Sequence, residues 1–342
     1  MIASADLLAL PFDQYGRHRD AATVAELVRA HEGPLRLAIL DVGGYPCLLR
    51  RFLPTDWIVV VDPLAAPQPR EPDRAYLRAS GTALPFQPDS FDLVVSLDSL
   101  EHVPAAERPH YLRELLRVSR RYVVLLAPFA SDETARAEAL LFEYVRATLH
   151  ADHAQLAEHR AHGLPDLADT MAQLRAAGAA CLVFPSGYLY HWLPLMLLKH
   201  YLLALDPDAG VHAALDRWYN ARDEQLDRRT PAYRHGIVAS KAGGTPTLAA
   251  VAARFAAPPT RPDEDLRARL DLQGVLHLLA LERGNRAPPL WEERLRAQER
   301  QIAALTREVE TLRAHLAAIR RGRVMRLLNA LAALRGRPGS PS

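Results

Sequence analysis

The chain has 342 residues, of which 49% are apolar and 24% are charged, and its formal net charge is only +2. These values exclude wholesale disorder, collagen-like repeats and disulfide-rich scaffolds, and the near-neutral charge gives no reason to expect a nucleic-acid partner. Two cysteines, Cys47 and Cys181, fit a reducing compartment. Residues 1–20 lack a basic region followed by an apolar stretch, so we expect a cytoplasmic protein.

Apolar runs typical of buried strands recur up to residue 241, separated by segments with helical patterning. After a polar, partly helical lead-in (1–34), the runs lie at residues 35–42, 57–63, 75–80, 91–98, 122–129, 179–187 and 233–241. Apolar strands that alternate with helices indicate a mostly parallel sheet covered on both faces. We therefore predict an α/β domain over residues 35–242, with helical inserts at 131–177 and 187–232.

Residues 188–205 are the most membrane-like stretch of the chain. They contain His191, Pro194, Lys199 and His200, and ionisable side chains are costly at the centre of a bilayer. We therefore predict a buried helix of a soluble domain here.

The turn after the first strand carries the strongest chemical signal. The strand ends at Asp41, and Gly43 and Gly44 (the glycine turn) lead into a helix. Glycines let the backbone approach a ligand at the carboxyl end of a sheet. The second strand ends at Asp62, 21 residues after Asp41, where an acidic side chain can accept hydrogen bonds from ribose hydroxyls.

These residues predict an adenosine-containing ligand, with a tight turn capped by an aspartate as the alternative. The G-x-G-x-x-G pattern of dinucleotide-binding folds is incomplete, because Cys47 stands where a further glycine would fall. An acidic turn also suits a cationic cofactor without phosphate better than it suits a pyrophosphate.

Four segments in order, DVGGYP, VVVDP, GTALPFQPDSFDLVVSLDSLEHVP and ELLRVSRRYVVLLAPF, together resemble the class I S-adenosylmethionine-dependent methyltransferases. The match is best to their small-molecule, type 11-like branch. It covers roughly residues 36–129 by motif and 179–241 by pattern. The resemblance implies a Rossmann-like, doubly wound, mostly parallel seven-stranded sheet, with S-adenosylmethionine as the cofactor.

The resemblance also implies roles for single residues. Asp41, Gly43 and Gly44 would surround the amino-acid part of the cofactor, and Asp62 would hold the ribose diol. The positions implied near the adenine and the sulfonium are Ser80, Gly81, Leu84, Ser96 and Asp98. Ser80 departs from the acidic residue that the family often has there, so a contact at that point would come from the backbone.

Histidines are the candidates for removing a proton from the acceptor. The resemblance places His102 at the mouth of the site, although packing at a helix start would also explain it. Four histidines form two pairs whose members are three residues apart: His150 with His153, and His159 with His162. Such pairs are typical of metal ligands, of substrate-lining groups or of a polar helix surface. Because no cysteine and no second cluster accompany them, we predict no metal site and take His153 as the second catalytic candidate.

Aromatic and polar residues at 187–192, 218–220 and 233–235 suit either an acceptor pocket or a core. In the lead-in, Tyr15 and Arg17 are candidates to close over the cofactor, and an exposed helix start is the alternative.

Beyond the domain, we predict a linker at 243–263, a helix at 264–284 and an α-helical coiled coil at 290–320. The core positions of its seven-residue repeat are Leu295, Ile302, Val309 and Leu316 in one set and Gln298, Leu305, Leu312 and Ile319 in the other. β-Branched residues in the first set and leucine in the second favour a parallel two-stranded coil. We therefore predict a homodimer through residues 291–320, with an amphipathic helix lying on its own domain as the alternative.

The last segment, 321–342, is predicted to be a basic amphipathic tail. Residues 320–337 hold six arginines and no acidic residue. Such a helix docks on an anionic surface, here the inner membrane face, or on a protein partner, and a frayed tail is the third alternative.

Together these features predict a methyltransferase for a small-molecule or glycan acceptor. An insert combined with a coil and a basic helix is similar to methyltransferases of bacterial cell-surface polysaccharide assembly. The alternative is a catalytically degenerate, methyltransferase-like adaptor that works through its coil, and the departures at Cys47 and Ser80 leave this alternative open.

Overall fold

A computed structural model describes residues 5–33, 35–64, 75–205, 211–221, 227–243, 245–256, 300 and 303–314. The chain divides into two units, Met1–Asn285 and Arg286–Ser342, which are considered separately.

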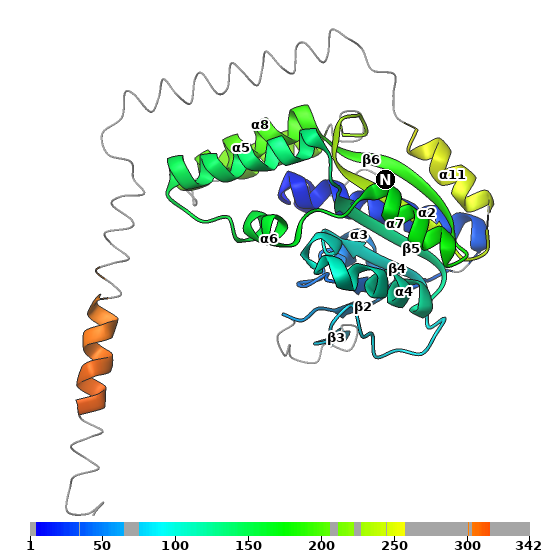
Figure 1. Cartoon of the computed structure of the whole chain (residues 1–342), viewed down its shortest axis with the longest axis horizontal. Helices are drawn as coiled ribbons and strands as arrows, with labels where there is room; N and C mark the ends of the chain where they lie inside the picture. Colours follow the sequence, from blue (N-terminus) through cyan, green and yellow to red (C-terminus); the bar gives the residue numbers. More distant parts are fainter. Residues whose placement is uncertain are drawn as a thin grey trace, which may run out of the picture. The chain divides into compact units, whose positions relative to one another are not determined.

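The first unit is built on one seven-stranded sheet (Figure 1). Its strands are β1 (Ala38–Val42), β2 (Trp57–Val61), β3 (Ala75–Leu77), β4 (Phe91–Leu97), β5 (Ser119–Pro128), β6 (Ala180–Tyr188) and β7 (Ala232–Ser240). Their order is β3-β2-β1-β4-β5-β7-β6, and β7 runs antiparallel to both of its neighbours. The predicted Rossmann-like, mostly parallel sheet is confirmed.

Helices cover both faces of the sheet and extend beyond one end of it. They are α1 (Ala5–Leu8), α2 (Phe12–Glu32), α3 (Leu49–Phe52), η1 (Leu100–His102), η2 (Ala105–Glu107), α4 (Arg108–Val118), α5 (Asp132–Leu149), α6 (Ala154–His162), α7 (Leu167–Ala176), α8 (Leu189–Leu205), α9 (Val211–Asn220) and α11 (Pro246–Arg254). The lead-in is therefore more regular than predicted, because α2 begins at Phe12 and is continuous to Glu32.

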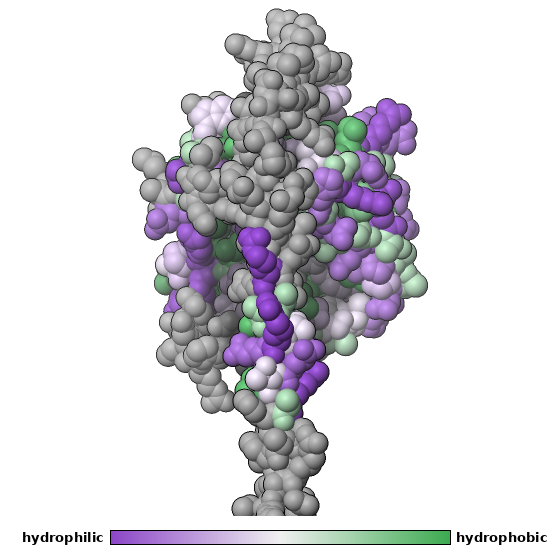
Figure 2. All heavy atoms as spheres, turned by 90° about the vertical axis from the view of Figure 1, so that its left-hand side faces the viewer, coloured by the Kyte–Doolittle hydropathy of each residue, from purple (hydrophilic) through white to green (hydrophobic). Residues whose placement is uncertain are grey.

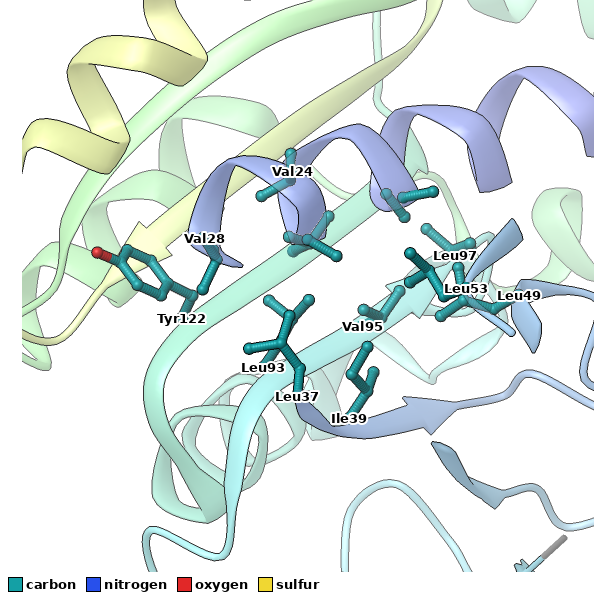
Figure 3. Close-up of a cluster of buried hydrophobic side chains, with 14 of the residues drawn as sticks. Val24, Val28, Leu37, Ile39, Leu49, Leu53, Leu93, Val95, Leu97 and Tyr122 are labelled. Carbon is teal, nitrogen blue, oxygen red and sulfur yellow. The ribbon is translucent and has the colours of Figure 1, made fainter. Parts of the chain in front are cut away.

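One face of the sheet is covered by α2, α3 and α11. Figure 3 shows Val24 and Val28 of α2 lying over strand residues that include Leu93 and Val95. The opposite face is covered by α4 and α7. Their leucines pack on Val94, Val123 and other strand residues whose side chains point to this face. Burial of the strands on both faces explains why they are apolar at nearly every position.

The prediction of a linker at residues 243–263 is partly wrong. Residues 246–254 form α11, in which Thr245 caps the first turn and Pro246 opens the helix. Val251 and Phe255 are at most 2% exposed in the core beneath α2. The small residues and prolines suggested a linker, but this short helix is stabilised by packing on the core, which local composition does not show.

A third apolar cluster joins the inserts beside the sheet. The helices α5 and α8 lie side by side, and both contribute to this cluster, as does α9 (Figure 1). The predicted buried helix is confirmed as α8, and its Lys199 donates to both oxygens of buried Asp216 at 2.8 and 2.7 Å. Of the helices that the structure describes, none has the length and apolar character that crossing a membrane requires.

The second unit contains a described helix at residues 303–314. Three predicted coil positions, Leu305, Val309 and Leu312, lie on it and are 45 to 54% exposed in the single chain. The other five predicted core positions, the helix at 264–284 and the tail at 321–342 lie outside the described residues.

Charged and polar side chains predominate among the coloured residues on the face of the molecule in Figure 2. The deeper polar groups that concern function lie at the carboxyl ends of the strands.

Candidate active site

The carboxyl ends of β1 and β4 form the crevice in which a ligand is expected. These strands are neighbours, with Val42 paired to Ser96, but the chain passes through β2 and β3 before it returns to β4. An open α/β sheet binds ligands where its connections diverge in this way. The glycine turn follows β1 at this point, and Asp98 follows β4.

The carboxyl group of Asp41 lies buried beside the glycine turn. The residue is 1% exposed, and within the described part of the chain neither carboxyl oxygen has a hydrogen-bond partner. Gly44 makes room for this group, because a Cβ there would overlap it. Burial raises the pKa of Asp41 to about 7, against the opposing charge of Arg17 and with a contribution from Asp62. Buried polar groups in proteins are nearly always hydrogen-bonded, so the unpaired carboxyl group makes Asp41 a candidate for contact with a ligand.

The structure gives a second reason for glycine at position 43. Gly43 has φ 79°, and a Cβ there would overlap the hydroxyl of Ser99. That hydroxyl donates to the Val42 carbonyl at 3.2 Å and so joins the loops after β1 and β4. Cys47, where a further glycine was expected, has φ 69°, so the turn keeps the left-handed conformation without the glycine that favours it.

Asp62 connects the end of β2 to the same turn. Its Oδ2 accepts from the Tyr45 N–H at 3.3 Å, and its Oδ1 accepts from the Leu64 N–H at 2.7 Å. An ionised carboxylate has about four acceptor positions. Asp62 therefore keeps capacity for the ribose hydroxyls that the sequence assigned to it.

The residues expected near the adenine separate into a buried group and an exposed one. A Cβ at Gly81 would overlap the ring of Tyr111, whose hydroxyl lies 2.8 Å from Ser96 Oγ. Leu84 is 4% exposed and packs in the same cluster as Tyr111. Ser80 is exposed, and its hydroxyl hydrogen-bonds to Thr82 within its own loop.

Two arginines hold Asp98, which the sequence placed near the cofactor. Arg17 on α2 donates to it, and Arg234 on β7 donates from Nε at 2.6 Å and from Nη2 at 2.5 Å. Burial by itself would raise the pKa of Asp98, but the two arginines outweigh it and hold the pKa below its usual range. Arg234 also donates to Asp13 at 2.9 Å. The four side chains (the Asp98 network) join α2, β4 and β7.

A cavity of about 70 Å³ lies next to the Asp98 network. Both predicted catalytic histidines, His102 and His153, line it, together with Glu101 and His159. Its wall includes Trp192, whose indole N–H donates to Asp13 at 2.7 Å. The cavity is therefore lined largely by polar groups, several of which hold one another by hydrogen bonds.

The two catalytic candidates differ in the proton that each ring carries. His102 Nδ1 lies 2.6 Å from Glu158 Oε2, and burial together with nearby His159 lowers the pKa of His102. If Nδ1 donates to the carboxylate, the neutral ring keeps a lone pair on Nε2. His153 begins α6, and its Nδ1 accepts a backbone N–H at 3.3 Å, which places its proton on Nε2. His102 is thus better placed to accept a proton.

The other histidine predictions have mixed outcomes. His150 follows α5 with φ 49° and His153 precedes α6, so this pair does not form part of one polar helix surface. His159 and His162 do lie on one helix, but they differ in burial. His159 is 6% exposed and faces Glu138 at 2.8 Å.

Two of the three predicted acceptor segments reach the cavity. Trp192 stacks on Tyr233 with 3.6 Å between ring centroids, and both line the cavity. The segment 218–220 does not reach it, because Trp218 is 51% exposed and Asn220 donates to backbone carbonyls near the N-terminus.

Sequence reasoning missed Asp13, Glu101 and Glu138. A signal existed only for Glu101, which directly precedes His102.

Comparison with protein families is consistent with this geometry. A family model described as a methyltransferase domain matches residues 59–126. An uncharacterized methyltransferase of Mycolicibacterium paratuberculosis is 32% identical over 195 residues, which cover 48% of this chain and 72% of the relative. An uncharacterized methyltransferase of Mycobacterium avium is 32% identical over 228 residues, which cover 55% of this chain and 84% of the relative. A relative from Mycobacterium sp. strain KMS is 36% identical over 139 residues. This match spans 35% of this chain and about half, 54%, of the relative.

Solved structures show more distant similarity. The YcgJ protein of Bacillus subtilis covers 65% of this chain and 98% of its own length, with 14% identity and a TM-score of 0.38. Magnesium protoporphyrin IX methyltransferase of Synechocystis was solved with bound S-adenosylhomocysteine. The match covers 67% of this chain and 85% of that protein, with 14% identity and a TM-score of 0.39.

Proposed function

This chain belongs to the class I S-adenosylmethionine-dependent methyltransferases, and on that basis we propose that it methylates a hydroxyl group of a small-molecule or glycan acceptor. The proposal places the acceptor in the cavity beside the Asp98 network. It includes a role in cell-surface polysaccharide synthesis, which the sequence pattern suggests and the polar cavity supports.

The observation that carries the proposal is the buried, unpartnered carboxyl group of Asp41 at the glycine turn. S-adenosylmethionine carries an ammonium and a sulfonium but no phosphate, so it suits a buried acid better than a dinucleotide does. When bound, it supplies an electrophilic methyl group. Asp41 and the glycine turn would hold its amino-acid part, Asp62 its ribose diol, and Gly81 and Leu84 would lie near its adenine.

The residues of the cavity would position the acceptor and remove its proton. A hydroxyl becomes a stronger nucleophile when a nearby base accepts its proton. His102 is the candidate, since its lowered pKa keeps the ring neutral and Glu158 holds the ring through Nδ1. The stacked aromatic pair Trp192 and Tyr233 forms part of the same cavity wall, and aromatic rings suit the apolar face of a sugar ring.

Calorimetric titration with S-adenosylmethionine tests the cofactor site. The exchange Asp62→Ala removes acceptors for the ribose hydroxyls, and hydrogen bonds to a charged group contribute about 1.5–3 kcal/mol. We therefore expect the affinity to fall about 10- to 100-fold. Asp169→Ala, on the exposed surface of α7, is the matched control and should bind as the wild type does. Wild-type affinity in Asp62→Ala would reject the assignment.

Because Asp62 also accepts from the Tyr45 N–H directly after the glycine turn, Asp62→Asn is the second variant. It keeps one side-chain oxygen and should lose less affinity than Asp62→Ala. Equal melting temperatures would show that the loss belongs to the cofactor and not to unfolding.

A radiolabelled-methyl screen over glycans and small metabolites tests the acceptor class. Labelling of a hydroxyl-bearing acceptor supports the proposal. Failure to bind S-adenosylmethionine at all would favour the adaptor alternative, in which the domain has lost turnover.

A further inference from the structure

Three side chains with metal-ligating atoms meet at the cavity from two distant segments. Glu101 and His102 lie on η1, and His159 lies on α6. One ligand atom from each lies within 4.8 Å of the other two. His159 Nε2 is 4.0 Å from Glu101 Oε1, and the two imidazole centroids are 4.9 Å apart.

Two of these groups are buried, and each has a polar atom without a hydrogen-bond partner among the described residues. Glu101 is 1% exposed and His159 is 6% exposed. Glu101 Oε2 and His159 Nε2 have no hydrogen-bond partner among the described residues. A buried polar atom is costly when nothing pairs with it, so both atoms point to a missing ligand.

Each histidine is backed by a carboxylate. Glu138 Oε1 lies 2.8 Å from His159 Nδ1, and Glu158 Oε2 lies 2.6 Å from His102 Nδ1. Glu138 is also held by the Tyr233 hydroxyl at 2.8 Å. Histidines that bind metals usually donate their other ring N–H to a carboxylate in this way, which orients the ring and raises its basicity.

Two buried carboxyl groups beside the Asp98 network also suit a cation. In the Asp98 network two aspartates face two arginines, so its charges balance. Glu101 and Glu138 remain as two further buried carboxyl groups on either side of His159. A divalent cation among Glu101, His102 and His159 would give these buried carboxyl groups a positive charge to face.

We propose that Glu101, His102 and His159 bind a divalent transition metal ion of the zinc class at the acceptor cavity. Two imidazole nitrogens and one carboxylate form a ligand set that holds zinc while leaving a coordination position open. Bond lengths of about 2.0–2.1 Å place tetrahedral ligand atoms about 3.4 Å apart. The cluster therefore has to contract by about an ångström, which side-chain rotation can supply.

The site itself stands on this geometry, whereas its role rests on the proposed methyl transfer. At the open position the ion would hold the acceptor hydroxyl and lower its pKa. The proton then leaves to water, and the oxygen forms its bond to the methyl carbon as the carbon–sulfur bond breaks with its electron pair left on sulfur. His102 cannot both bind the ion and accept this proton, so an occupied metal site replaces the base assigned above.

Zinc titration of the full chain tests the site. Protein dialysed against EDTA should bind one Zn²⁺ per chain in calorimetry, and Co²⁺ should give the visible absorption bands of a tetrahedral site. Glu101→Gln and His159→Gln should weaken Zn²⁺ binding by more than about 100-fold. His162→Gln, on the same helix but outside the cluster, is the control and should bind as the wild type does.

Glu138→Gln tests the positioning of His159. Loss of a carboxylate that orients a ligating histidine lowers metal affinity by about 10- to 100-fold. It should also alter the Co²⁺ spectrum while leaving one Zn²⁺ per chain. Circular dichroism of each metal-free variant checks that its fold is intact.

Two results would overturn the proposal: no stoichiometric Zn²⁺ binding by the wild type, or unchanged binding by Glu101→Gln and His159→Gln. S-adenosylmethionine binding is measured on the same metal-free samples. If the cofactor binds but zinc does not, the metal site fails and the proposed function stands with His102 as base. If zinc binds but the cofactor does not, the proposed function fails.

Discussion

Asp41 shows how one buried side chain connects folding with cofactor binding. Its carboxyl group lies in the space left by Gly44 and has no partner among the described residues. A group buried in this way destabilises the fold when ionised, because the unfolded chain solvates the charge better. A cationic cofactor would offset that cost. Asp41 is also a residue that the sequence predicted to contact the cofactor.

We expect this burial to appear as a pH dependence of stability. The pKa of Asp41 is about 7 in the folded chain against 3.8 as its ordinary value. Between these values the folded chain holds a proton that the unfolded chain has released, so raising the pH favours unfolding, and above about pH 7 the effect is constant. Asp41→Asn lacks this group. Its stability relative to wild type should therefore rise by about 2 kcal/mol between about pH 5.5 and pH 7.

Urea denaturation of both proteins across this pH range measures the difference. A difference that does not change with pH would show that Asp41 is ionised throughout and that the turn stabilises its charge by other means.

At the scale of elements, the Asp98 network decides how α2 is held on the sheet. Asp13 and Arg17 lie on the first turns of α2, Asp98 follows β4, and Arg234 belongs to β7. The sequence indicated Arg17 and Asp98 as separate candidates for cofactor contact. The structure pairs them because β4 and β7 flank β5 and run in opposite directions. The carboxyl end of β4 and the amino end of β7 therefore lie at the same edge of the sheet, where α2 begins.

Removing Arg234 should be strongly destabilising. Arg234→Ala leaves Asp13 and Asp98 buried with only Arg17 to balance them, and breaking a buried pair costs about 3–5 kcal/mol. Arg120→Ala is the matched control, since Arg120 pairs with Asp92 at the surface with its side chain 48% exposed. Such exposed pairs contribute about 0–1 kcal/mol.

Urea denaturation monitored by circular dichroism provides both free energies of unfolding. Equal values for the two variants would mean that water replaces the Arg234 side chain at no cost, and that the network does not hold α2.

At the scale of the whole molecule, the second unit carries the prediction about assembly. Leu305, Val309 and Leu312 recur on one side of the helix at 303–314, and all three are exposed in the single chain. An apolar stripe of this spacing is stabilised when a second helix covers it. The predicted homodimer through 291–320 therefore remains our proposal for what covers these residues.

Charge in this stripe should separate the chains. We expect sedimentation equilibrium at micromolar concentration to show a dimer for wild type and a monomer for the double variant Leu305→Asp/Leu312→Asp. The exchange Glu308→Gln/Glu310→Gln on the same helix is the control. The monomeric variant should still bind S-adenosylmethionine, because the cofactor site lies entirely in the first unit. A double variant that still dimerises would place the interface on the methyltransferase domain.

The sequence by itself determined those features that depend on the order of residues over a short stretch of the chain. Apolar runs gave the strands, and the glycine turn with Asp41 and Asp62 indicated the cofactor crevice, because these residues lie at fixed distances along one βαβ unit. At Cys47, where the pattern lacks a glycine, the structure has a left-handed residue that the sequence did not predict.

Only the tertiary structure decided which distant residues meet. Glu101 and His159 are 58 positions apart, and Asp98 and Arg234 are 136 apart, yet each pair faces one cavity. Likewise α11, in a segment whose composition suggested a linker, is a helix because Val251 and Phe255 pack on the core. Side-chain clusters of this kind arise from how strands and inserts stack in space, and no periodicity along the chain records that arrangement.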